Sequence, residues 1–99
     1  MIINYLIEKA TNAFYSTDSI HQQLYHCKAE VATDSSHSFA VLKSYNTIVA
    51  YCDLRIIPAV LYVFDYYNAI TNSTHIPKFR NLICEKYHLS WSQVDVRHL

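Results

Sequence analysis

The alternation of apolar and polar positions divides the chain into helical and strand-like segments, beginning with a helix. Near the N-terminus, apolar residues recur at three- and four-residue spacing from Ile3 through Leu6 and Ala10. That spacing places them on one face of a helix, so the pattern predicts a helix over Ile2–Ala13. The polar residues Ser16–Ser19 then indicate a turn or a cap.

Later segments have the periodicity of β-strands. Leu24–Thr33 alternates between apolar and polar residues and predicts a strand, which the hairpin turn Asp34–His37 follows. Ser38–Cys52 carries apolar residues on both faces, which predicts a strand covered on both sides and bent or bulged near Ser44–Asn46. Ala59–Tyr67 is rich in β-branched and aromatic residues and is predicted to be a central strand.

The pattern returns to helical spacing in the last third of the chain. Apolar residues from Ile76 to Tyr87 share one stripe, which predicts a helix over Thr74–His88 that packs on the sheet. Ser73 is predicted to cap this helix, so that Pro77 lies in the first turn, where its missing N–H has little effect.

Residues Leu89–Leu99 fit two descriptions. Ser90 and Gln93 have the spacing of a helix capping box, whereas Val94 and Val96 alternate as they would in a short strand. The pattern leaves both descriptions open.

These segments together predict a single α+β domain over residues 1–99. The expected architecture is a small antiparallel sheet of three to four strands, with an N-terminal helix and a C-terminal helix packed on it. Apolar residues make up 52% of the chain and charged residues 16%, which is typical of a folded domain with little solubilising charge. Part of the apolar surface is therefore expected to contact a partner.

The charge and the glycine content exclude several classes of function. Eight basic and eight acidic residues cancel without forming runs, which disfavours a cationic nucleic-acid-binding platform. The chain contains no glycine, although nucleotide phosphate loops, the GxSxG nucleophile elbow and the KH clamp all require it. Since no other catalytic motif stands out, the chain is predicted not to be an enzyme and to use no cofactor.

Cysteine usage and hydropathy indicate a reducing cytosol. The widely spaced Cys27, Cys52 and Cys84 fit small buried residues in a reducing compartment better than they fit disulfides. The N-terminus lacks a basic signal region, and the longest apolar run, Ile56–Phe64, is far shorter than the roughly 20 residues of a membrane span. Because the adjacent His26 and Cys27 would point to opposite faces of a strand, no metal site is predicted.

Tyrosine is the main excess in the composition, with nine residues in the chain. Tyrosine provides a large contact area at low entropic cost and is enriched at protein interfaces. The predicted partner-binding residues are therefore Tyr62, Tyr66 and Tyr67 in the last strand, with Lys78 and Arg80 in the helix that follows. Contact with protein is favoured over stacking on unpaired bases, because few basic residues accompany these tyrosines.

Several blocks of sequence resemble a small domain family of bacterial phages and mobile elements. The blocks LKSYNTIVAYCD, LYVFDYYN and AITNSTHIPKF are similar to the family patterns SYxTxVA and LYVxGxYSxTTxxHIxxF, and the resemblance spans Leu24–Phe79. His26 and Asp65 stand where the family has glycine, and Ala69 stands where it has serine. Because the activity of the family is unassigned, the resemblance implies a phage-like protein in the bacterial cytoplasm but no site.

The expected function follows from that setting by analogy. Small phage proteins without an enzymatic motif often act as stoichiometric binders of host machinery, and anti-CRISPR proteins are one such group. The chain is therefore expected to be a non-enzymatic inhibitor that contacts a host protein, specifically an RNA-guided CRISPR nuclease. The alternative is a small nucleic-acid-binding accessory protein. No membrane contact is expected, and formation of a homodimer is left open.

Overall fold

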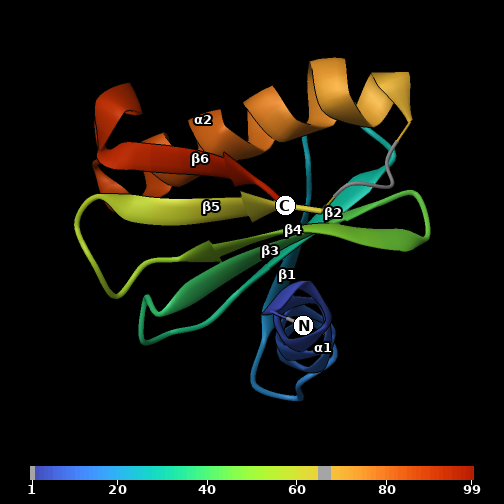
Figure 1. Cartoon of the computed structure of the whole chain (residues 1–99), viewed down its shortest axis with the longest axis horizontal. Coiled ribbons are helices and arrows are strands. Elements are labelled where there is room, and N and C mark those ends of the chain that lie inside the picture. Colours follow the sequence, from blue (N-terminus) through green and yellow to red (C-terminus); the bar gives the residue numbers. More distant parts are fainter. Residues whose placement is uncertain (1, 65–67) are drawn as a thin grey trace.

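The computed structural model describes residues 2–64 and 68–99, which form one mixed sheet between two long helices (Figure 1). In chain order, the elements are α1 (Ile2–Phe14), β1 (Ile20–Gln23), β2 (Ala29–Thr33), β3 (Phe39–Ser44), β4 (Thr47–Asp53), β5 (Ala59–Val63), the π-helix η1 (Thr71–His75), α2 (Ile76–Tyr87), the 3₁₀ turn η2 (Trp91–Gln93) and β6 (Val94–His98). The predicted α+β class and both helices are confirmed, with α1 one residue longer than expected.

The strands lie in the sheet in the order β1-β2-β3-β4-β5-β6. The first five form an antiparallel meander, whereas β6 pairs parallel to β5. A parallel pair needs a crossover connection, and the helices η1 and α2 provide it. The prediction of three to four antiparallel strands is therefore wrong in both number and direction. The prediction that the segment beginning at Ala59 is a central strand is confirmed, because β5 lies between β4 and β6.

The first missed strand is β1, which pairs antiparallel with β2. The strand predicted over Leu24–Thr33 is confirmed for Ala29–Thr33, which is β2, but residues 24–28 form a hairpin turn in which the Leu24 N–H donates to the Ala29 carbonyl at 2.9 Å. His26 adopts a φ of 56° in this turn. Glycine adopts that conformation without steric cost, whereas a histidine there is less favourable.

The second missed strand results from a chain reversal at Tyr45 and Asn46. The sequence predicts one strand with a bend or bulge there, but the structure turns back and separates β3 from β4. Tyr45 adopts a φ of 54° at the turn, and the expected irregularity lies nearby, as a register shift between Leu42 and Lys43. The hairpin turn predicted over Asp34–His37 is confirmed.

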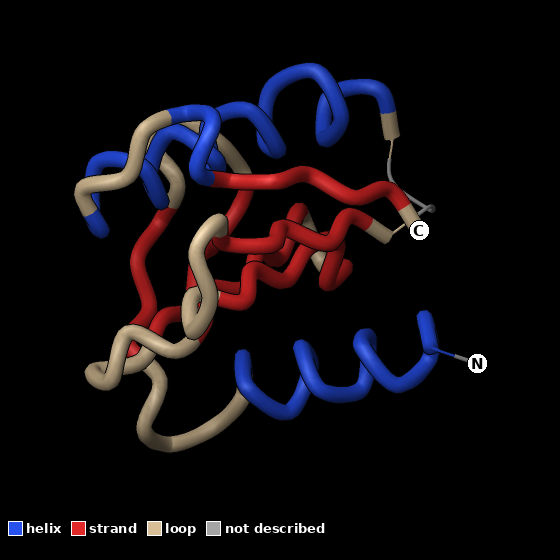
Figure 2. The backbone as a smooth tube through the Cα atoms, turned by 60° about the vertical axis from the view of Figure 1, so that its left-hand side comes forward, coloured by secondary structure: helices blue, strands red, loops and turns tan. Residues whose placement is uncertain are grey.

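The helices cover opposite faces of the sheet, so the fold has three layers (Figure 2). This arrangement explains why the central strands are apolar on both faces, as predicted for 38–52. The buried residues on the α1 side are Leu6, Ala10, Phe14, Ala32, Val41, Ile48, Tyr51 and Phe64. On the α2 side they are Leu24, Cys27, Ala29, Val31, Ala40, Leu42, Val49, Ala50, Cys52, Ala59, Leu61, Val63, Ile76, Phe79, Ile83 and Val94.

The helical segment before α2 starts earlier than predicted. Ser73 does not cap it, because helix begins at residue 69 and widens into the π-helix Thr71–His75 before α2. Pro77 follows directly, and its missing N–H falls where the hydrogen-bond pattern changes from π to α. The predicted apolar stripe is confirmed, with Ile76, Phe79 and Ile83 buried.

Both descriptions of the C-terminal segment are correct for different residues. Ser90 and Gln93 form the capping box of η2, and the chain then extends into β6. Neither α1 nor α2, nor any other helix in the described ranges, combines the length and the apolar character needed to cross a bilayer.

Candidate binding surface

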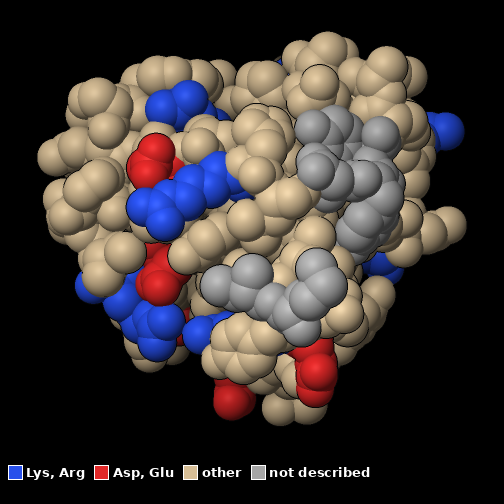
Figure 3. Space-filling view, in the orientation of Figure 1, with Lys and Arg blue, Asp and Glu red and all other residues tan. Residues whose placement is uncertain are grey.

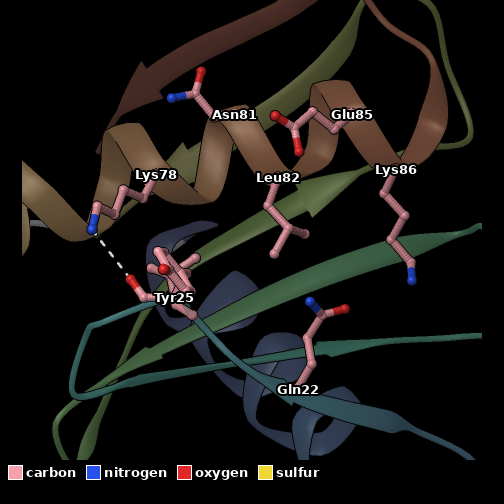
Figure 4. A pocket seen from close by; sticks show the side chains of 8 residues that line it. Gln22, Tyr25, Lys78, Asn81, Leu82, Glu85 and Lys86 are labelled. Carbon is pink, nitrogen blue, oxygen red and sulfur yellow. Dashed lines mark hydrogen bonds between the residues drawn. The ribbon is translucent and has the colours of Figure 1, made fainter.

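A groove of about 600 Å³ lies between the edge strand β1 and helix α2. Figure 4 shows Leu82 and Lys86 extending from α2 toward the sheet, while Gln22 extends from β1 toward the helix. The complete lining consists of Gln22, Leu24, Tyr25, Lys78, Asn81, Leu82, Glu85 and Lys86. The lining therefore combines two leucines and a tyrosine with five polar or charged side chains.

Tyr25 stands at one end of this groove and is 75% exposed. The left-handed conformation of His26 directs the hairpin turn so that the two rings lie against each other, with centroids 3.9 Å apart. The Lys78 ammonium donates a hydrogen bond to the Tyr25 carbonyl at 3.2 Å and so fastens α2 to this turn (Figure 4). Tyr25 is thus an aromatic side chain on an anchored backbone.

The lining of the groove is more basic than acidic. Lys78 and Lys86 contribute two positive charges, and Glu85 contributes one negative charge. On the face drawn in Figure 3, by contrast, basic and acidic side chains lie next to one another. Elsewhere in the described chain, Arg55 pairs with Asp53 at 3.0 Å and Arg97 pairs with Asp95 at 3.1 Å.

The structure assigns different roles to the residues predicted to bind a partner. Lys78 lines the groove. Tyr62 is half-buried on the α1 side of the sheet, where it packs against the core. The remaining predicted tyrosines, Tyr66 and Tyr67, lie outside the described residues, as does Asp65. The predicted residues therefore do not form one surface within the described chain.

Arg80, the fifth predicted residue, makes contacts within the chain. Its guanidinium lies 3.9 Å from the centroid of the Trp91 ring and donates to the carbonyls of Trp91 and Val94, both at 2.7 Å. These contacts join α2 to η2 and to the start of β6. Because cation–π stacking and two charge-assisted hydrogen bonds occupy the guanidinium, Arg80 is engaged in holding the C-terminal segment.

Sequence reasoning missed Tyr25 because it placed this residue inside a strand. Two signals point to its true position. The segment IHQQ has no apolar alternation, which is typical of an exposed edge, and histidine is among the residues that more often adopt a positive φ at a turn. Together they indicate a hairpin turn between two strands.

A buried polar cluster joins the β3–β4 hairpin to the π-helix. The Ser44 hydroxyl lies 2.6 Å from the Thr71 hydroxyl and 2.7 Å from Nδ1 of His75, and each of these residues is only 2% exposed. The Tyr45 ring lies 5.4 Å from the His75 ring. The wide π turn brings Thr71 and His75 to the same hydroxyl, and such turns often mark functional positions.

The serine and histidine of this cluster have the spacing of a nucleophile and its base, but solvent does not reach them. A nucleophilic hydroxyl must meet its substrate, and Ser44 is enclosed between the sheet and the helix. Burial, together with the charge of Lys78, holds the pKa of His75 below its ordinary value and favours the neutral ring. The cluster therefore satisfies buried polar groups and links two elements.

The cysteines are free thiols with different accessibility. Cys27 and Cys52 are buried and Cys84 is half-buried. Burial raises the pKa of Cys52 to about 12, so this thiol carries no nucleophilic charge at neutral pH. Within the described ranges, no three histidine, cysteine or acidic side chains come together in a group suited to a metal ion.

No known protein family, curated protein or solved structure matches this chain. The resemblance over Leu24–Phe79 to a phage and mobile-element domain therefore stays a prediction from the sequence.

Proposed function

We propose that the chain is a non-enzymatic binding protein that contacts another protein through the groove between β1 and α2. The observation that carries this proposal is the exposure of Tyr25, 75% of whose surface is open beside the groove. Exposed tyrosines are typical anchors of protein interfaces, because burying the ring on association releases ordered water. Lys78, a residue predicted from sequence, lies in the same groove.

We propose further that the partner is a protein of the host. Specifically, we propose that it is an RNA-guided CRISPR nuclease and that the chain inhibits it. The support for this step is the sequence resemblance over Leu24–Phe79 and the analogy with small phage inhibitors. The groove supports the general part of the proposal, which is contact with a protein. The chain would bind such a partner in the bacterial cytoplasm.

The alternative of a nucleic-acid-binding accessory protein has less support. Arg80, one of its two candidate cations, stacks on Trp91 and donates to two carbonyls. Phosphate contacts require accessible cations on one surface. Arg55 and Arg97 pair with neighbouring acids, and the groove lysines Lys78 and Lys86 share its lining with Glu85. A titration of labelled single-stranded DNA at low salt checks this alternative, and tight binding that weakens steeply with salt would favour it over the protein partner.

The test of the proposed function compares Tyr25→Ala with Tyr5→Ala. Tyr5 is similarly exposed, at 63%, but it lies on α1, on the other side of the sheet. The immobilised wild-type chain is expected to capture a protein from bacterial host lysate, and a captured nuclease is then assayed for inhibition of target cleavage. We expect Tyr25→Ala to lose capture and inhibition and Tyr5→Ala to retain both. Equal recovery by both variants would show that the groove is not the contact surface.

A further inference from the structure

Strand β1 presents an open edge to solvent. It ends the sheet, and all four of its residues are exposed. The Leu24 N–H donates to the Ala29 carbonyl, and this pair continues the register that joins Gln22 to Val31. Since hydrogen-bonded pairs alternate along an antiparallel ladder, the intervening His21 and Gln23 direct their N–H and C=O groups away from β2. These are the groups that an added strand would bond.

The two edges of the sheet differ in how they resist pairing with another chain. At the opposite edge, β6 carries the charged residues Asp95 and Arg97, and charges on an edge discourage pairing. The β1 sequence IHQQ contains no lysine, no proline and no acidic residue. Of the two edges, β1 is therefore the one without these protections.

Two hollows lie beside β1. One is the groove on the α2 side, with Gln22 and Leu24 in its lining. The second, of about 540 Å³, includes His21 and Gln23, which alternate with Gln22 and Leu24 along the chain, and it shares Gln22 with the first. Successive side chains of a strand point to opposite faces, so an extended segment beside β1 would place alternate side chains toward each hollow. A helix would use a single groove, which makes an extended segment the better fit.

The charge around β1 indicates the chemistry of that segment. Lys78 and Lys86 line one hollow, and Lys28 lines the other. Glu30, which is hydrogen-bonded to His21, and Glu85 balance two of these three lysines, so one positive charge remains in excess. Carboxylates on an incoming strand would complement this excess.

We propose that β1 accepts an extended, acidic segment of the partner protein as an additional strand of the sheet. The inference rests on the proposed function, because it specifies how a protein partner is held. Backbone hydrogen bonds from His21 and Gln23 supply sequence-independent affinity, and carboxylates near the lysines supply selectivity. Tyr25 closes one end of the groove in which the segment lies.

The first test uses a proline substitution that removes one outward N–H. Gln23→Pro deletes that donor without removing a bond to β2. Gln23→Ala is the matched control. It loses the same side-chain hydrogen bond to the Cys27 carbonyl but keeps the backbone N–H. Peptides are selected on the wild-type chain from a phage-displayed random library, and their affinities are measured by fluorescence anisotropy. We expect the selected peptides to be acidic and β-prone. Their affinity for Gln23→Pro should be about tenfold lower than for the wild-type chain, and their affinity for Gln23→Ala should be unchanged.

A second measurement does not depend on the folding of the proline variant. Hydrogen exchange of the wild-type chain with and without a selected peptide is expected to show new protection at the His21 and Gln23 amides. Lys86→Glu is expected to lower the affinity for the peptide about tenfold. Arg97→Glu makes the same charge change on β6 and is expected to leave the affinity unchanged.

Several outcomes would contradict strand addition at β1. The proposed function, binding of a protein through the groove, is tested separately by Tyr25→Ala. Peptides without acidic residues, no enriched peptide, or unchanged exchange at both amides each contradict an acidic added strand. A dimer seen by light scattering that Gln23→Pro abolishes and Gln23→Ala keeps identifies a second copy as the occupant instead. If Tyr25→Ala loses a captured partner while Gln23→Pro retains it, the chain binds protein through the groove but not by strand addition.

Discussion

Ser44 and His75 lie 31 residues apart in sequence, yet the Ser44 hydroxyl is 2.7 Å from Nδ1 of His75 inside the protein. The contact joins the last residue of β3 to the last residue of the π-helix. A serine hydroxyl has one proton to donate, so it can donate to one of its neighbours, Thr71 or His75, and accept from the other. The arrangement satisfies all three side chains in a space that water does not reach.

This contact predicts that the stability of the fold depends on the protonation of His75. Burial first, and the charge of Lys78 second, lower the pKa of His75 in the folded chain. The unfolded chain, with an ordinary histidine pKa near 6.5, then binds more protons than the folded chain at mildly acidic pH. The contribution of His75 is therefore fully present above about pH 6.5 and is lost as the pH falls through and below that value.

The measurement is the free energy of unfolding by urea at pH 7.5 and pH 5.5. His75→Asn keeps a donor near Ser44 but cannot titrate, so we expect a lower stability at pH 7.5, by about 1–3 kcal/mol, and a smaller fall toward pH 5.5. Asp53, whose carboxyl pKa is lowered chiefly by its hydrogen bond with Arg55, titrates below this window. An equal fall in wild type and variant would mean that His75 does not control the pH dependence.

Replacement of Arg80 is predicted to loosen the C-terminal segment. Arg80→Ala removes the stacking on Trp91 and the hydrogen bonds to two carbonyls, and we expect a loss of about 1–3 kcal/mol in the free energy of unfolding. The control is Arg97→Ala, because Arg97 makes an exposed pair with Asp95 that contributes about 0–1 kcal/mol. Equal effects of the two variants in a urea titration would contradict the assigned role of Arg80.

The turn at His26 predicts a stabilising substitution. His26 has a φ of 56°, and this left-handed conformation is unfavourable by about 1 kcal/mol for residues other than glycine. His26→Gly should therefore raise the melting temperature and stabilise the fold by up to about 1 kcal/mol. Lys28 lies in the same turn but does not have a positive φ, so Lys28→Gly is expected to lower the stability of the fold. Destabilisation by both variants would contradict strain at His26.

The cysteines are predicted to react with thiol reagents at very different rates. Cys84 is half-buried, whereas Cys27 and Cys52 are buried and the pKa of the Cys52 thiol is raised to about 12. Under native conditions a spectrophotometric thiol assay should show one fast group, and Cys84→Ser should abolish it. All three thiols should react in denaturant. A fast phase that survives in Cys84→Ser would show that a buried thiol becomes exposed by local opening.

The candidate site could be predicted from sequence only in part. Lys78 lines the groove, and its role in binding a partner stays a prediction. The position of Tyr25 in a turn and the contacts of Arg80 within the chain were not predicted, since both depend on segments distant in sequence. Lys78 reaches across 53 residues to the Tyr25 carbonyl, and Arg80 reaches the carbonyl of Val94, 14 residues away.

The sequence by itself determined the amphipathic helices, the apolar character of the central strands on both faces and the hairpin turn at Asp34–His37. These features depend on side chains close together along the chain, so local periodicity and turn chemistry reveal them. Only the tertiary structure decided that the polar IHQQ is a strand, that the chain reverses at Tyr45 and that β6 returns parallel to β5. An exposed edge strand has no buried face and hence no alternation, and its partner is identified only when the sheet forms.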